Sequence, residues 1–518
     1  MSAGLIALTV IFAVVTAGAG IGFYAGARYK MDLEQWTVAR RGFGVVLVWL
    51  LMAGEIYTTF AFLGASGWAY SRGGPALYIL AYLPLGYVVS FYILPHLWEI
   101  GRAHRLQTQS DFFEKRYNSK YLAAFVSLIG VVSLVPYVQL QLTGLGIIVG
   151  VASFEAIGRT AAMVIAAVIV AAFVFASGIR AVAWVSVLKD ILLLGAAISI
   201  GIGVPYSYFH GIGPMFAALV HRHPGHLVMP GSTKNLGHGW YISTVLLNSL
   251  GAYMWPHTFG ASFTAKTGNV LRRNAVIMPL YTITLPFIFF VGFAAVMIVP
   301  GLSNGDLSLL TMVRKTFPAW WLGVIGGAGA LTAMVPAAIL ILTAATLFVK
   351  NFWRPLLSPT MTDDQVARFA KIMVGIVTST ALYFAIYSSQ TLVNLLLLGY
   401  DGVAQFFPGV VLGLYWKRVT KPAVWSGMLA GVAVASVLVL SKHDPFVGVN
   451  AGFIALCLNF TTVATVSMLT TVEGGGFEKA REAGPSVPHR CGGGGTRHES
   501  RLRGSMLFSS ASHARARV

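Results

Sequence analysis

Long apolar runs, separated by short polar or basic stretches, dominate this sequence. A run of about 18 apolar residues is long enough to cross a lipid bilayer as a helix. We predict thirteen such spans, numbered in chain order, at residues 4–27, 43–70, 75–97, 121–149, 160–177, 182–206, 239–260, 275–300, 320–349, 369–388, 391–415, 422–441 and 446–471. The pattern therefore predicts an all-α polytopic membrane protein.

The composition supports this interpretation. Of the 518 residues, 56% are hydrophobic and only 10% are charged, whereas a soluble chain has about 25% charged residues. This hydrophobicity excludes disorder for most of the chain, and two cysteines are too few for a disulfide scaffold. Residues 472–518 differ, because they combine glycine runs with scattered arginines and lack periodicity. We predict that they form a disordered cytoplasmic tail.

The net charge of +19 could suggest nucleic-acid binding, but the positions of the charges indicate another role. Twenty Lys and Arg residues lie in one set of alternate loops, and seven lie in the other set. Basic loops of membrane proteins stay in the cytoplasm. We therefore predict an N-terminus outside, a C-terminus inside, the bilayer as partner, and no nucleic-acid partner.

Span 2 contains features that disfavour a continuous helix. Unwound backbone at mid-membrane depth survives only where it lines a cavity, and in transporters such breaks mark the binding site. Gly54 precedes Glu55, a carboxylate deep in an apolar run, and burying that charge costs at least ~2.5 kcal/mol. Glu55 should face a cavity, carry a proton or meet a cation. The alternative is a neutral glutamate that bonds neighbouring helices.

Span 7 carries a second set of helix-breaking residues. Pro256 removes a backbone donor and frees a carbonyl one turn earlier, and Gly251 weakens the same stretch. A simple proline kink is the alternative to a break. Since five spans separate the two breaks, the spacing fits a 5+5 inverted repeat. Its core would cover about residues 43–415, with extra helices at both ends.

Three segments resemble the sodium:solute symporter family, whose core has the LeuT-type fold. Residues 111–117 (DFFEKRY) resemble the "EFLEKRYG" loop of that family, and residues 177–184 (SGIRAVAW) are similar to its "GGLRAVAWTD" signature. Residues 399–408 (GYDGVAQFFP) resemble its passage between spans 11 and 12. Within the family, residues 54–70 look most like those of bacterial monocarboxylate permeases.

The resemblance implies that residues 1–471 form a transporter domain, not an enzyme, working by alternating access. We expect a monomeric symporter of the bacterial cytoplasmic membrane, without a cofactor. It would import a short monocarboxylate of the lactate, pyruvate or acetate type, coupled to H⁺ or Na⁺. The alternatives are a Na⁺-coupled symporter for an amino acid or another small solute, and a membrane sensor without net transport.

The coupling ion depends on residues that depart from the family pattern. Family sodium sites use two carbonyls at the break of span 2, which match Ala53 and Ile56, and two hydroxyl side chains of span 9. Val335 and Pro336 stand where those hydroxyls are expected, although Thr332 lies one turn away. Sodium prefers oxygen ligands. We therefore hypothesise proton coupling through Glu55, with Na⁺ as the alternative and no other metal.

The predicted substrate site lies between spans 2 and 7. No Arg or Lys falls in the middle of spans 2, 4, 7 or 11, so the positive ends of half-helices and neutral polar groups would hold a carboxylate. The candidates are Thr58, Thr59, Gln141, Asn248, Tyr253 and Trp255. Each could instead bond two helices together. The same choice applies to Asp401 and Gln405, which could close an inner gate or bond neighbouring helices.

Overall fold

The computed structural model describes residues 2–27, 33–176, 179–233 and 235–471. The predicted tail, residues 472–518, lies outside them. The helices are α1 (Ala3–Ala27), α2 (Leu33–Val38), α3 (Val45–Ile56), α4 (Ala65–Ser71), α5 (Tyr78–Ala103), α6 (Gln109–Tyr117), α7 (Lys120–Ala152), α8 (Arg159–Ala176), α9 (Ile179–Phe209), α10 (Ile212–Arg222), α11 (His238–Gly251), α12 (Pro256–Ser262), α13 (Gly268–Thr282), α14 (Leu285–Ile298), α15 (Ser308–Thr316), α16 (Ala319–Leu347), α17 (Arg354–Leu357), α18 (Asp363–Tyr387), α19 (Leu392–Val403), α20 (Phe407–Tyr415), α21 (Lys421–Leu440) and α22 (Ala451–Leu469). Short helical turns occur at η1 (Ala39–Arg41), η2 (Phe60–Gly64), η3 (Gly74–Leu77), η4 (Gly305–Leu307), η5 (Phe348–Trp353) and η6 (Ala404–Phe406).

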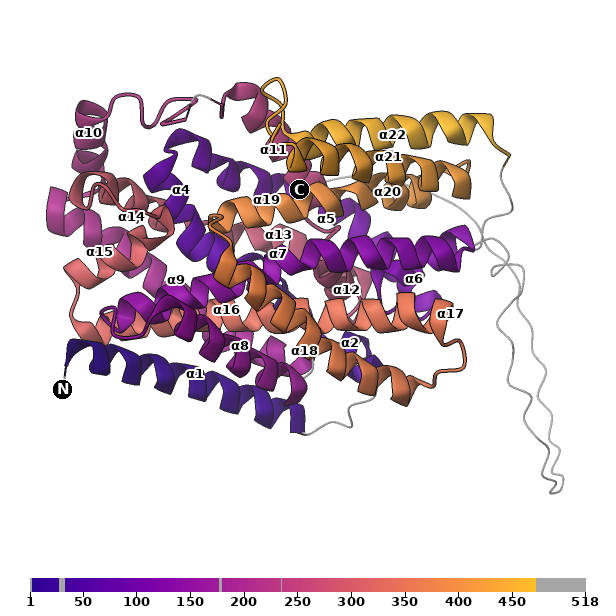
Figure 1. The fold of residues 1–518 in the computed structure, drawn as a ribbon, viewed down its shortest axis with the longest axis horizontal. Helices are drawn as coiled ribbons and strands as arrows, with labels where there is room; N and C mark the ends of the chain where they lie inside the picture. The colour runs from indigo at the N-terminus through magenta and orange to yellow at the C-terminus, as the bar shows by residue number, and fades with distance from the viewer. Residues whose placement is uncertain (1, 28–32, 177–178, 234, 472–518) are drawn as a thin grey trace, which may run out of the picture.

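Most of the long helices run between two ends of the molecule (Figure 1). One end, on the right of Figure 1, carries α6 and α17 and is called the basic end here, because the basic loops cluster there. The opposite end carries α10 and α15. Helix α1 packs on one side against α9 and α16, whereas α21 and α22 pair with each other on the far side. Helix α16 lies between them, almost fully buried.

The number of spans differs from the prediction. Among the described residues, ten helical segments are long and apolar enough to cross a membrane, and eleven if one bent pair counts as a span. Thirteen spans are therefore not confirmed. One missing segment is the apolar helix Arg159–Phe175, which is shorter than the others. The other is span 7, because its break leaves α11 and α12 each too short to cross alone.

Both predicted helix breaks are present. Helix α3 ends at Ile56, residues 57–58 are not helical, and the next helical stretch, Phe60–Ser71, is bent by 57° from α3. In span 7, α11 ends at Gly251 and α12 begins at Pro256. At the first position of a helix the N–H has no partner within the helix, so proline loses no hydrogen bond there. Each break thus follows from a local sequence signal. The inverted repeat around them stays a prediction.

Candidate functional site

A small cavity lies where the two helix breaks meet. Its lining comes from α3, α5, α7, α12, α19 and the α11–α12 break, and consists of Glu55, Ile56, Tyr82, Leu83, Tyr87, Tyr137, Ala252, Tyr253, Trp255, His257, Thr258, Leu396 and Tyr400. The volume open to water is ≈ 20 Å³, which is room for about one water molecule. The structure thus brings spans 2 and 7 together around a closed space.

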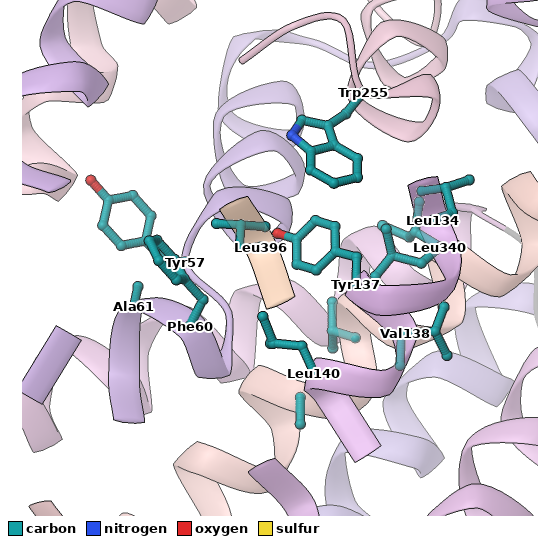
Figure 2. Packing of buried hydrophobic residues seen from close by; sticks show 14 of the residues in the cluster. Tyr57, Phe60, Ala61, Leu134, Tyr137, Val138, Leu140, Trp255, Leu340 and Leu396 are labelled. Atoms are coloured by element: carbon teal, nitrogen blue, oxygen red, sulfur yellow. The ribbon is translucent and has the colours of Figure 1, made fainter. Parts of the chain in front are cut away.

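Aromatic side chains fill most of this site. The rings of Tyr137 and Trp255 lie 4.8 Å apart between centroids, and Tyr400 lies 5.2 Å from Trp255 with its ring edge-on. Figure 2 shows Trp255 beside Tyr137, with Tyr57 on the far side of the packed cluster. The Tyr137 hydroxyl donates to the carbonyl oxygen of Glu55 over 3.1 Å. Helix α7 therefore supports the unwound end of α3 directly.

Glu55 places a buried carboxyl group in the wall of the cavity. Its side chain lines the cavity and is 1% exposed. Neither carboxyl oxygen has a hydrogen-bond partner among the described residues. Lys189 is the positive group that interacts with it electrostatically. Burying a carboxylate without a hydrogen-bond donor is costly, so the neutral, protonated form is favoured in such surroundings. Glu55 is therefore a candidate proton site.

A buried ion pair at the first break was not predicted from the sequence. The ammonium of Lys189 on α9 donates to the carbonyls of Gly54 and Tyr57, over 3.2 and 3.1 Å. It also lies 2.9 Å from Oδ1 of Asp190, and both side chains are at most 1% exposed. The Tyr281 hydroxyl donates to the same Asp190 oxygen over 2.9 Å. The sequence did contain a signal for this pair, namely a Lys next to an Asp in an apolar helix. Such residues are rarely buried unless they are paired.

The predicted ion-coupling carbonyls each accept a backbone hydrogen bond. The carbonyl of Ala53 accepts the Tyr57 N–H over 2.8 Å, and that of Ile56 accepts the Thr58 N–H over 3.2 Å. The carbonyls that face a cation belong to Gly54 and Tyr57, one residue further along. The Thr332 hydroxyl is buried and donates over 2.7 Å to Ala328 in its own helix α16.

The predicted substrate residues occupy two layers around the breaks. Tyr253 and Trp255 line the cavity, whereas the other four are buried beside it. The Thr59 hydroxyl donates to Oε1 of Gln141 over 2.7 Å, which ties the second half of span 2 to α7. Asn248 has no hydrogen-bond partner for its side-chain amide among the described residues. Thr58 accepts the N–H of Phe60 over 3.2 Å and so supports the restarted helix.

His257 separates the cavity from a second small cavity nearer the basic end. The second cavity has a water-accessible volume of ≈ 30 Å³, and Thr37, Gln107, Thr108 and Pro256 are among its lining residues. His257 lines both cavities, and its Nδ1 has no hydrogen-bond partner among the described residues. One imidazole ring therefore forms part of the closure on this side.

Helix α6, which contains the DFFEKRY segment, bonds to neighbouring elements at the basic end. Gln109 donates to the carbonyl of Met254 in the second break over 2.9 Å. Asp111 pairs with Lys350 over 2.7 Å and accepts a hydrogen bond from Asn351. Burial alone would raise the pKa of the Asp111 carboxyl, but Lys350 and the donated hydrogen bonds outweigh it, so the pKa lies below its ordinary value. Helix α6 thus connects the second break to η5, through Gln109 on one side and the Asp111 ion pair on the other.

Asp306 makes a comparable contact at the opposite end. Its Oδ2 accepts the Leu392 N–H over 3.0 Å at the start of α19, while its backbone packs against Gly67 of α4. Burial raises the pKa of this carboxyl to about 6, against the Leu392 hydrogen bond and the charge of Arg159. Asp306 therefore links span 2 to span 11 outside the membrane-spanning segments.

The Asp401 and Gln405 pair proves to join helices. The amide of Gln405 donates to the backbone carbonyls of Asp401 and, on α22, Gly452, over 3.1 and 3.2 Å. Asn459 on α22 donates back to the Gln405 carbonyl over 2.8 Å. These bonds attach η6, the short turn that follows α19, to α22, so Gln405 bonds neighbouring helices, which is the second of the two alternatives.

Comparisons with known proteins agree on one family. The profile of the sodium:solute symporter family matches residues 36–431. The chain is 44% identical to an uncharacterised symporter, YhjB, of Bacillus subtilis (strain 168), over 90% of this chain and 97% of the relative. It is 28% identical to a monocarboxylate transport permease protein of Rhizobium johnstonii, over 87% of this chain and 94% of the relative.

The fold has a counterpart among solved structures. A Na⁺-coupled sialic acid symporter, in a substrate-bound outward-open state, matches with a TM-score of 0.75. The match covers 91% of this chain and 98% of that one, at 15% identity. The architecture is therefore that of LeuT-like transporters, and the protein is a multi-pass membrane transporter rather than an enzyme. The chain belongs to the sodium:solute symporter family.

Proposed function

We propose that this protein imports a short monocarboxylate together with a proton, by alternating access. The observation that carries the proposal is the cavity between two broken helices with the unpartnered carboxyl of Glu55 in its wall. A transporter that binds a proton and a solute in one closed space can release both on the other side. Glu55 supplies the proton site, and the space beside it supplies the solute site.

Neutral donors of the cavity suit a small carboxylate. The lining contains no Lys or Arg among the described residues, but it offers five tyrosine hydroxyls and the Trp255 indole. We assign Thr58, Thr59, Gln141 and Asn248 to the wall that the solute meets when the cavity widens. The monocarboxylate class is supported by the Rhizobium relative.

The orientation and assembly are also part of the proposal. We infer that the basic end faces the cytoplasm of a bacterial cell and that the N-terminus lies outside, because cytoplasmic loops carry the excess of basic residues. The cavity and both breaks belong to a single chain, so one monomer suffices for transport. No cofactor takes part.

Proteoliposomes with an imposed pH gradient test the proposal. Wild-type protein should concentrate one or more of lactate, pyruvate and acetate, and replacing Na⁺ by choline at fixed pH should leave uptake unchanged. Glu55→Gln should bind solute but fail to concentrate it, whereas Glu99→Gln, an exposed change on α5, should behave as wild type.

Three results would contradict parts of this proposal. Collapse of wild-type uptake in choline would reject coupling by protons alone. An energised Glu55→Gln variant that still concentrates solute would reject Glu55 as the proton carrier. A wild-type protein that binds these carboxylates and accumulates none of them would favour the sensor alternative, and accumulation of amino acids alone would reject the monocarboxylate class.

A further inference from the structure

The hydrogen-bonding capacity of Lys189 is fully used at the first break. An ammonium group has three N–H donors. Here the three acceptors are the carbonyls of Gly54 and Tyr57 and the carboxylate of Asp190, over 2.9 to 3.2 Å. Both carbonyls lie at the C-terminal end of α3, where the helix dipole favours a positive charge. The group is therefore held as a cation by the ligands that a small metal cation would use.

The surroundings of Lys189 do not fit a sodium ion at the same place. In the family pattern, a sodium ion at this place is held by carbonyl oxygens of the break and by two hydroxyls of α16, but Val335 and Pro336 offer no hydroxyl. The two carbonyls already accept from the ammonium. Two positive charges at one buried place would also repel each other.

Among the described charged groups around Lys189, only Glu55 can change the net charge by gaining or losing a proton. Lys189 and Asp190 form a neutral pair, and Tyr281 donates to Asp190. Glu55 interacts electrostatically with Lys189 but receives no hydrogen bond from it, because the three donors are engaged elsewhere. The ionisable groups around the ammonium in the described structure are thus Glu55, Asp190, Tyr281 and Tyr57. A proton on Glu55 makes the whole cluster neutral, and its loss leaves one net negative charge.

We propose that Lys189 is a tethered cation that takes the place of a bound sodium ion at the helix break, so that Glu55 alone carries the exchangeable charge. Lys189 acts as a positioning residue: it holds the end of α3 against α9 through Gly54 and Tyr57. Its charge is supplied by the chain itself and not by an ion from solution. The role of Glu55 rests on the proposed proton coupling, whereas the role of Lys189 as tethered cation does not.

Removing the lysine should create a sodium site. Lys189→Ala leaves two carbonyl oxygens and the Asp190 carboxylate around a vacated space. The test is the thermal unfolding midpoint of purified protein in Na⁺ or choline at equal ionic strength. We expect wild type and Lys189→Arg to be insensitive to Na⁺. Lys189→Ala should unfold at a lower temperature, and Na⁺ should raise its midpoint saturably. Lys189→Ala/Asp190→Ala, without the carboxylate, should lose this response.

A matched control separates this role from ordinary destabilisation. Lys350→Ala also removes the lysine of a Lys–Asp pair, the partly buried one with Asp111, and should unfold earlier in both salts without a Na⁺ response. A saturable Na⁺ shift of wild type would overturn the proposal, and so would a folded Lys189→Ala that ignores Na⁺. If Lys189→Ala does not fold in either salt, the wild-type and Lys189→Arg titrations decide.

Transport measurements form the second arm of the experiment. Uptake by Lys189→Ala should require Na⁺, whereas wild-type uptake should proceed equally in choline. The unfolding assay needs no substrate, so its outcome does not depend on the proposed monocarboxylate. A Na⁺ response confined to Lys189→Ala, together with no uptake by wild type, would reject the proposed function and keep the tethered cation.

Discussion

Neutralising Asp306 should remove a pH-dependent loss of stability. This carboxyl is 1% exposed, and its Oδ1 has no hydrogen-bond partner among the described residues. Burial raises its pKa from 3.8 to about 6. An acid whose folded pKa is raised stabilises the protein below its unfolded pKa, and that stability disappears as pH rises through the folded pKa. Asp306→Asn keeps the shape of the group but cannot ionise.

The size of the effect follows from the two pKa values. A difference of about 2 units corresponds to a loss of ~3 kcal/mol across the full titration, at about 1.36 kcal/mol per unit. Between about pH 4.5 and pH 7.5, the window in which a detergent-solubilised protein can be handled, ~2 kcal/mol of this loss should appear. With an unfolding entropy near 2.1 cal/mol/K per residue, the midpoint should move by about 2 °C.

The assay is a series of thermal unfolding curves in detergent across this window. The midpoint of Asp306→Asn relative to wild type should rise steadily with pH, because only wild type pays for the buried charge. Asp364→Asn removes an exposed carboxylate at the start of α18 and should run parallel to wild type. If the Asp306→Asn and wild-type curves also run parallel, burial does not govern the ionisation of Asp306 and the reasoning is refuted.

Three further changes test other contacts. In Gly54→Ala the new Cβ would lie 2.7 Å from Oγ of Ser186, so overpacking should cost ~1–3 kcal/mol in thermal unfolding, and Ser186→Ala should restore part of it. Tyr137→Phe removes the bond to the Glu55 carbonyl, so solute affinity in a binding assay should fall about 2- to 10-fold, as for a bond worth ~0.5–1.5 kcal/mol. Asp111 has a pKa below its ordinary value of 3.8 in the folded protein, so the stability it contributes is present above pH 3.8 and disappears as the pH falls through the folded pKa. Acid unfolding curves of Asp111→Asn should not show this loss of stability.

Local signals made the two breaks predictable from the sequence. Gly54 beside Glu55, and Gly251 followed by Pro256, each disfavour a helix by their own backbone or charge properties. The breaks appear at residues 57–58 and 252–255, within a few residues of those signals. The number of spans was harder to predict, because an apolar run does not reveal whether its helix is continuous.

Contacts across long sequence distances were not predictable in the same way. The bond from Lys189 to the Gly54 carbonyl joins residues that are 135 positions apart, and no spacing rule specifies how far a lysine side chain reaches. The register of the carbonyls is a similar case. A shift by one residue, from Ala53 to Gly54, turns the carbonyl by about 100° around α3. Which carbonyl faces α9 therefore depends on helix packing.

The tethered cation gives two departures from the family pattern a common cause. In the family pattern, a bound ion at the break is held jointly by carbonyls of α3 and hydroxyls of α16. A lysine that reaches the break from α9 brings its own charge and needs acceptors only from α3 and its neighbour Asp190. On this reasoning Val335 and Pro336 are tolerated because Lys189 is present. The proposal then requires that hydroxyls returned to α16 leave the wild-type protein indifferent to Na⁺ until Lys189 is removed.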